Sequence, residues 1–274
     1  MNINAIIMCK DAKGLIHEVT ALLIQQQVNV TKLEEHVEAG QFFMRIQWVD
    51  EEDREIDFWK TVFLPFKEKN DAQTIFQDER VSSKIILFCS KELHCLLDIL
   101  NHIQIGDIKA TVQAVVSNHK DAKDHVEAQH IPFHYCPEGN KDRKDHEKEV
   151  LKIVKRYDYD CIGLARYMRI FSSHFLEQIT HPMINVHHSF LPAFIGQNPY
   201  QQAHKKGVKM IGATAHYVTE ALDEGPIIYQ DVVKTSHLDN PERLKQVGKK
   251  CEKEVFFYAL KKQVENKLIF CGER

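Results

Sequence analysis

The feature that most limits the fold is a regular alternation of short apolar segments with helical segments after residue 84. The apolar strand patterns lie at 84–89, 110–117, 131–134, 160–165, 183–187, 212–218 and 227–230. The helical patterns lie at 93–103, 121–129, 146–157 and 241–262. Strands that alternate with helices form a mostly parallel sheet with helices on both faces. The sequence therefore predicts an α/β domain over residues 84–274.

The first 80 residues follow a different pattern, βαββαβ. The predicted strands are 3–9, 28–37, 42–49 and 72–76, and the predicted helices are 15–23 and 54–69. In the first helix, the apolar side is formed by Leu15, Ile16, Val19, Leu22 and Leu23. This order is that of a ferredoxin-like fold. A polar connector at 78–83 separates it from the second region, so we predict two domains, 1–80 and 84–274.

The strand at 42–49 carries apolar side chains on both faces, since Phe42, Met44, Ile46 and Trp48 alternate with Phe43. One face covers the domain's own helices, and the other requires a partner. We therefore expect a closed homo-oligomer.

Composition excludes several classes of protein. A net charge of −3 gives no general attraction to nucleic acid or to anionic membranes. No apolar run reaches the roughly 18 residues of a membrane span, and the N-terminus lacks the features of a secretory signal. The seven cysteines show no Cys-x-x-Cys spacing, which indicates reduced thiols in a cytoplasmic protein. We expect no bound metal and no cofactor.

Candidate catalytic side chains gather between Ile184 and Asp231. Asn185 and His187 end an apolar strand, and a loop with Pro192, Gly196 and Pro199 follows. Asp223 begins an Asp-Glu-Gly-Pro turn. In open α/β sheets, ligands bind beyond the carboxyl ends of the strands. Each of these residues alone is more often a structural hydrogen-bonding or turn residue, but their ordered combination favours a catalytic cluster.

Other chemistries fit this stretch less well. Ser189 is not part of a Gly-x-Ser-x-Gly elbow, so its expected role is to form turn hydrogen bonds. His187 and His188 are adjacent on a strand, and we expect them to point to opposite faces instead of sharing a metal.

This stretch resembles the folate-dependent formyltransferase family, whose motif begins Asn-x-His and closes with Leu-Asp-x-Gly-Pro. The resemblance implies a Rossmann-like formyltransferase domain with Asn185, His187 and Asp223 as catalytic residues. It also implies a set of residues that bind the folate substrate: Met168, Arg169, Ile170, Val218, Leu222 and His216.

The first strand-to-helix junction of this domain, Ser90-Lys91-Glu92, contains no glycine. A backbone cradle for phosphate needs glycine, and the glycinamide ribonucleotide branch of the family has a Gly/Ser-rich junction there. The simplest other acceptor of the formyl group is water. Three segments resemble the 10-formyltetrahydrofolate deformylase branch of the family: the junction, Leu164–Ile170 and His187–Pro192. In the last segment, His188 stands where the transferases commonly have Pro.

That resemblance implies hydrolysis of 10-formyltetrahydrofolate to formate and tetrahydrofolate, with folate as substrate and not as cofactor. The reaction would supply formate and balance one-carbon folate pools for purine synthesis. Asp223 would act as base or proton relay, and His187 and Asn185 would stabilise the oxyanion.

The N-terminal domain resembles the ACT domain through Cys9-x-Asp11-x-x-Gly14 and Val28-Asn29-Val30. It departs from that family at Lys10, where Pro is common, and at Gln27, where Gly is common. The resemblance implies an amino-acid effector bound near Asp11, Gly14 and Asn29. A role in assembly alone stays equally open.

Two other functions remain open at this point. One is a formyltransferase with a non-phosphorylated amine acceptor, and formate release without added amine distinguishes the two. The other is a non-catalytic amino-acid sensor built on the ACT-like domain, which the presence of Asn185, His187 and Asp223 disfavours.

Overall fold

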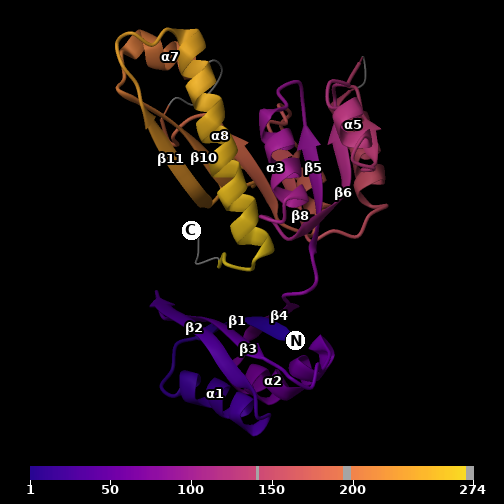
Figure 1. Cartoon of the computed structure of the whole chain (residues 1–274), viewed down its shortest axis with the longest axis vertical. Helices are drawn as coiled ribbons and strands as arrows, with labels where there is room; N and C mark the ends of the chain where they lie inside the picture. Colours follow the sequence, from indigo (N-terminus) through magenta and orange to yellow (C-terminus); the bar gives the residue numbers. More distant parts are fainter. Residues whose placement is uncertain (140–141, 194–198, 270–274) are drawn as a thin grey trace. The chain divides into compact units, whose positions relative to one another are not determined.

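The computed structural model describes residues 1–139, 142–193 and 199–269. The chain divides into two compact units (Figure 1). Unit 1 holds Met1–Ser82 together with the segment that starts at Asn266, and unit 2 spans Ser83–Glu265.

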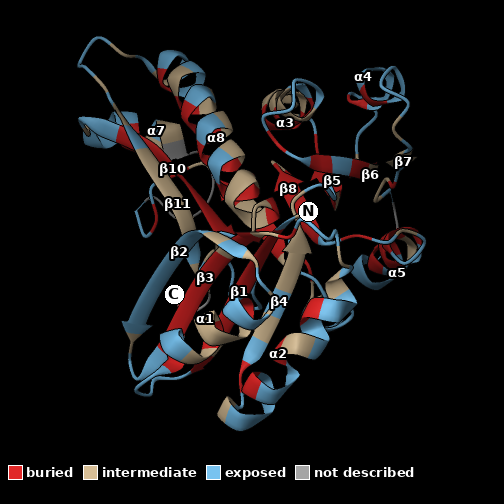
Figure 2. Ribbon diagram, turned by 60° about the horizontal axis from the view of Figure 1, so that its bottom comes forward, coloured by how far each residue is buried: buried red, intermediate tan, exposed pale blue. Residues whose placement is uncertain are grey.

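Unit 1 contains a four-stranded antiparallel sheet in the order β2-β3-β1-β4, with both helices on one face (Figure 1). Its elements follow the βαββαβ order that the sequence predicts: β1 (Asn2–Lys10), α1 (Leu15–Gln25), β2 (Asn29–Glu38), β3 (Gln41–Val49), α2 (Ile56–Asn70) and β4 (Gln73–Asp78). The inner faces of β1 and β3 form its buried core with Trp59 and Phe63 of α2, and both strands are largely buried (Figure 2).

Ile16 is 42% exposed, so its prediction as part of the apolar side of α1 was wrong. It lies about 100° around the helix from buried Leu15.

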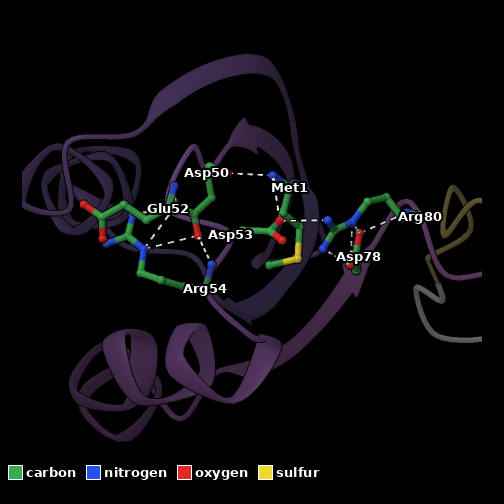
Figure 3. Close-up of polar contacts among 7 residues, drawn as sticks. All are labelled: Met1, Asp50, Glu52, Asp53, Arg54, Asp78 and Arg80. Atoms are coloured by element: carbon green, nitrogen blue, oxygen red, sulfur yellow. Dashed lines mark hydrogen bonds and ion pairs between the residues drawn. The ribbon is translucent and has the colours of Figure 1, made fainter.

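A charged network in unit 1 joins the start of β1 to the ends of β3 and β4 (Figure 3). The ammonium group of Met1 donates to the backbone oxygen of Asp50 at 2.6 Å and lies 3.2 Å from the carboxylate of Asp53. Arg80 pairs with Asp53 at 2.7 Å, and Arg54 pairs with the fully buried carboxylate of Asp50 at 2.9 Å. The buried carboxylate is thus compensated by a cation four residues later.

Unit 2 is an α/β structure with a seven-stranded mixed sheet in the order β11-β10-β9-β8-β5-β6-β7. Its strands are β5 (Ser83–Cys89), β6 (Ala110–Ser117), β7 (Phe133–Tyr135), β8 (Cys161–Ala165), β9 (Met183–His187), β10 (Met210–Tyr217) and β11 (Ile227–Lys234). Its helices are α3 (His94–Gln104), α4 (Lys123–Glu127), α5 (Arg143–Val154), α6 (Ser173–Glu177), α7 (Pro199–Lys206) and α8 (Pro241–Val264). The pairings from β7 to β9 are parallel, whereas β10 pairs antiparallel with both β9 and β11.

Helices cover both faces of this sheet, as predicted. On one face, α5 and α6 pack on β5 and β8 in a single buried cluster. On the other face, α8 lies close to β8. A Cβ atom added to Gly163 of β8 would lie 3.1 Å from Phe256 of α8 and 2.9 Å from Leu87 of β5. The chain moves outward from β5 to β6 and then returns to the other side of β5 as β8. Such a reversal of strand order opens a crevice at the carboxyl ends of the strands.

Several predicted boundaries differ from the structure. Helix α5 begins at Arg143 instead of residue 146, because the side chain of Asp142 accepts a hydrogen bond from the backbone NH of Asp145 at 2.8 Å and caps the helix. Residues 140–141, which precede this helix, lie outside the described residues. The sequence did not predict α6 or α7. The expected loop around Pro192, Gly196 and Pro199 falls largely on residues 194–198, which also lie outside.

Within the described parts of the chain, no helix has both the length and the apolarity needed to cross a membrane. The six cysteines found in these ranges are all free and buried.

Candidate active site

A cavity of about 750 Å³ lies in unit 2 beyond the ends of β8, β9 and β10. This volume falls in the range of small-molecule sites. All nine residues predicted for catalysis or folate binding line it: Asn185, His187, Asp223, Met168, Arg169, Ile170, Val218, Leu222 and His216. Its apolar wall also includes Leu164, Tyr167, Phe171 and Leu176.

The carboxylate of Asp223 lies between two imidazole rings. One oxygen is 3.2 Å from Nδ1 of His187, and the other is 3.5 Å from Nε2 of His216. The amide nitrogen of Asn185 is 3.3 Å from the same Nε2 of His216. These contacts follow from the sheet, since the antiparallel register of β9 and β10 sets Asn185 opposite His216. Four polar side chains from two strands and one loop therefore form a single cluster.

Burial alone would raise the pKa of Asp223, but hydrogen bonds with His187 and His216 outweigh it and hold this pKa well below its usual value. The carboxylate is thus ionised at neutral pH. Nδ1 of His216 donates to the backbone oxygen of Tyr217 at 2.9 Å. In contrast, Nε2 of His187 is buried and has no hydrogen-bond partner in the described residues. A buried polar atom without a partner at a cavity wall indicates that a bound molecule completes it.

The turn that carries Asp223 is fixed by close backbone packing. Asp223 itself has a left-handed φ of 58°, which Asp tolerates better than most residues. A Cβ added to Gly225 would lie 1.9 Å from the backbone oxygen of Tyr217, so only glycine fits there. The backbone NH of Tyr217 also donates to the oxygen of Pro226 at 2.9 Å. The turn that carries Asp223 is consequently bound to the end of β10.

A second polar cluster, which the sequence did not predict, surrounds the buried carboxylate of Glu252 on α8. Nε2 of His94 lies 2.7 Å from it, Nε of Arg166 lies 3.2 Å away, and the hydroxyl of Tyr200 donates to it. Burial would raise the pKa of Glu252, but the hydrogen bond with His94 and the charge of Arg166 lower it to about 2. The sequence contained one signal, because Glu252 lies between Gly248 and Phe256 on the buried side of a long helix.

His94, Cys95 and Glu252 place three potential metal-ligand atoms within 4.8 Å of one another. The guanidinium group of Arg166 already binds this carboxylate, and burial raises the pKa of the Cys95 thiol well above its usual value. A protonated thiol and a neighbouring fixed cation are poor conditions for metal binding. The chemistry of this group fits a buried ion pair better than a metal centre.

The first strand-to-helix junction also makes its own contacts. The hydroxyl of Ser90 donates to the side chain of Asn118 at 2.7 Å and accepts from the backbone NH of Met168 at 3.0 Å. Glu92 lies 2.7 Å from Nζ of Lys245 and also pairs with Lys249. These two lysines outweigh the effect of burial and lower the pKa of Glu92 to about 2. The junction thus holds the loop after β8 and pairs one carboxylate with two lysines of α8.

One expectation about His187 and His188 was wrong. Both rings line the same cavity, with centroids 5.3 Å apart. Strand β9 ends at His187, so the strict alternation of a strand no longer applies to His188.

The residues predicted to bind an effector in unit 1 do not meet within one copy of the chain. Asp11 and Gly14 follow the end of β1, next to the turn at Gly40. Asn29 is paired with Val49, which in turn pairs with Asn2 at the other end of β1. All three are exposed.

We expect replacement of Glu252 by Gln to lower the free energy of unfolding by about 3–5 kcal/mol, since Arg166 would keep a buried charge without its partner. Because the pKa of Glu252 is lowered in the folded state, its contribution is complete above its usual value of 4.5 and is lost as pH falls toward 2. Urea titrations between pH 7 and 3 measure this effect.

The matched control is Glu254→Gln, an exposed position on the same helix, which should change stability by less than about 0.5 kcal/mol. Equal stability of the two variants at pH 7 would contradict a stabilising role for this ion pair.

Comparison with known proteins shows the family to which the chain belongs. Residues 83–260 match the formyl transferase family. The chain is 40% identical to formyltetrahydrofolate deformylase of Bacillus subtilis, over 96% of this chain and 89% of that protein. The crystal structure of a formyltetrahydrofolate deformylase from Pseudomonas syringae superposes with a TM-score of 0.96 at 34% identity, covering 99% of this chain and 92% of that one. A glycinamide ribonucleotide transformylase from Symbiobacterium toebii gives 0.67 at 28% identity, covering 73% and 94%. The chain therefore belongs to the formyltetrahydrofolate deformylase family, within the formyl transferase fold.

Proposed function

We propose that this protein hydrolyses 10-formyltetrahydrofolate to formate and tetrahydrofolate. The observation that carries the proposal is the ionised carboxylate of Asp223 beside His187, whose Nε2 is buried without a protein partner at the wall of a 750 Å³ cavity. The names of relatives at 34–40% identity support the same substrate. In the cell, the reaction supplies formate and balances one-carbon folate pools for purine synthesis, in the cytoplasm.

The proposed reaction begins with attack of water on the formyl carbon. A carbon–oxygen bond forms, the electrons of the carbonyl bond move to its oxygen, and Asp223 accepts the proton that water loses. When the ring of His187 carries both protons, Nδ1 donates to Asp223 and Nε2 donates to the oxyanion, and the amide of Asn185 donates a second hydrogen bond to it. The bond between carbon and the folate nitrogen then breaks, and the proton passes from Asp223 to that nitrogen. His216 holds the second oxygen of Asp223 throughout.

The cavity wall supports the choice of folate as substrate. Met168, Ile170, Val218 and Leu222 provide an apolar surface of the kind that binds flat ring systems. Met168 and Ile170 are each more than half exposed, so they are available to a ligand.

The charges of the cavity favour water as the acceptor over a phosphorylated amine. Three cations line the cavity, and each is already paired with a carboxylate: Arg166 with Glu252, Arg169 with Glu138, and Lys245 with Glu92. A phosphate dianion would have to displace one of these carboxylates.

Unit 1 is proposed to be an ACT-like domain that joins subunits. Its long edge strand β2 is mostly exposed and pairs only with β3 among the described residues. Such an edge can pair with another chain. An amino-acid effector that contacts Asp11, Gly14 and Asn29 together would need two copies of the domain.

Replacement of Asp223 by Asn should lower kcat by about 10²- to 10⁴-fold, because the amide keeps the shape of the side chain but cannot accept the proton. Asn also tolerates the left-handed backbone of this position. Formate release from 10-formyltetrahydrofolate measures the effect, and Glu224→Gln, the exposed neighbour, is the control.

Near-normal turnover of the Asp223 variant would contradict the role of Asp223 as the proton acceptor.

His187→Asn and Asn185→Ala should each reduce kcat by about 10²- to 10³-fold with smaller changes in KM. An increase in KM alone would make them binding residues.

Glycinamide ribonucleotide should neither accelerate loss of the formyl group nor become formylated, since the cations of the cavity are occupied. Chromatographic analysis of tetrahydrofolate, formate and the formylated amine tests this. A rate that rises with the nucleotide, with the formyl group recovered on its amine, would place the chain among the transferases.

Deletion of residues 1–80 should reduce the number of subunits in the oligomer, as measured by light scattering. If the shortened chain forms an assembly with the same number of subunits as the full chain, unit 2 alone holds the subunits together.

A further inference from the structure

A water nucleophile is positioned by its hydrogen bonds alone, whereas an amine acceptor is also positioned by contacts with the rest of its molecule. Water carries two hydrogens, and one lone pair must point at the formyl carbon. Two acceptors must therefore hold the two O–H groups, and an error of about 1 Å in position can reduce the rate about 100-fold. Asp223 provides the first acceptor in the mechanism above.

Most polar groups beside Asp223 are already engaged. Nε2 of His216 meets Asp223 and Asn185, and its Nδ1 donates to a backbone oxygen. The hydroxyl of Tyr200 donates to Glu252, and Glu92 is held by two lysines. Both ring nitrogens of His216 are thus occupied, and Tyr200 and Glu92 are fixed in position by their protein partners.

His188 is different. Its ring lines the cavity directly after His187, and within the described residues it makes no hydrogen bond to the protein. The ring lies between two neighbouring rings. The centroid of the His188 ring is 5.3 Å from that of His187 and 6.1 Å from that of Tyr200. Tyr200 is in turn fixed by Glu252, and it fits against α8 because a Cβ at position 248 would lie 2.1 Å from its hydroxyl.

His188 is also uncharged. Burial and the nearby Arg166 lower its pKa to about 3, with a smaller contribution from His187, while Glu252 and Asp223 act in the opposite direction. A neutral imidazole has one ring nitrogen with a free lone pair. This acceptor is therefore available throughout the neutral pH range.

We propose that His188 is a further catalytic residue, which accepts a hydrogen bond from the attacking water and holds it beside Asp223. The proposal rests on the hydrolysis proposed above and adds the group that makes water an effective acceptor. Asp223 removes one proton from the water, and the other stays on the oxygen, bonded to His188, until formate leaves.

The test compares His188→Phe, which keeps a ring against His187 and Tyr200 but has no acceptor, with His188→Gln, which restores an acceptor. The full chain is incubated with 10-formyltetrahydrofolate, and formate and tetrahydrofolate are measured. We expect kcat of the Phe variant to fall about 10- to 100-fold with little change in KM, and the Gln variant to recover part of the loss.

A second measurement separates loss of the water site from general damage to the cavity. Hydroxylamine is added as a small nucleophile that is intrinsically much more reactive than water, so its attack depends less on a residue that positions it. Its nitrogen bonds to the formyl carbon, the bond to the folate nitrogen breaks, and a proton moves to that nitrogen. The ratio of formohydroxamate to formate should rise at least about tenfold in the Phe variant relative to the unchanged chain.

An unchanged ratio, or normal formate release by the Phe variant, would overturn the role of His188. Failure of the unchanged chain to release formate would instead overturn the proposed hydrolysis, so the two failures are distinguishable.

Discussion

The antiparallel pairing of β9 with β10 is the interaction on which the site depends. It sets Asn185 across from His216 and His187 across from Thr214, so the polar side chains of two strands face one another. The chain then returns through the turn that brings Asp223 to both histidines. A shift of this pairing by one residue would turn one set of side chains to the other face of the sheet. The antiparallel pairing of β10 with β9 thus forms part of the candidate site as well as part of the sheet.

The buried carboxylate of Glu252 makes a second, longer-range connection. It binds groups from the start of α3, the end of β8 and α7, which are brought together only in the folded unit. Removal of a carboxylate from water is costly unless its partners compensate the charge, and here Arg166, His94 and Tyr200 do so. Arg166 also has a left-handed φ of 61°, a conformation unusual for a residue with a long side chain. The ion pair and the local backbone of the substrate-lining loop are therefore linked.

Much of the fold followed from the sequence because its signals are local. The alternation of strands and helices in unit 2, and the βαββαβ order of unit 1, appear in periodicities of a few residues. The candidate catalytic side chains, which the structure brings to one cavity, could be selected because they lie in one stretch of about forty residues, with glycine and proline at fixed places. In contrast, the Glu252 cluster joins residues up to 158 positions apart, and spacing along the chain does not reveal such a contact. The predicted start of α5 lay three residues too late, because the prediction did not include the N-terminal cap formed by Asp142.

The backbone contact at Gly225 has a consequence for how this site can vary. Gly225 and Pro226 attach the backbone that follows Asp223 to the end of β10. Residues 219–222, which precede Asp223, form part of the cavity wall. The fold therefore separates the part of the loop that lines the cavity from the part that attaches Asp223 to the sheet. A substitution at 219–222 would change the shape of the cavity, whereas a side chain at Gly225 would displace the carboxylate.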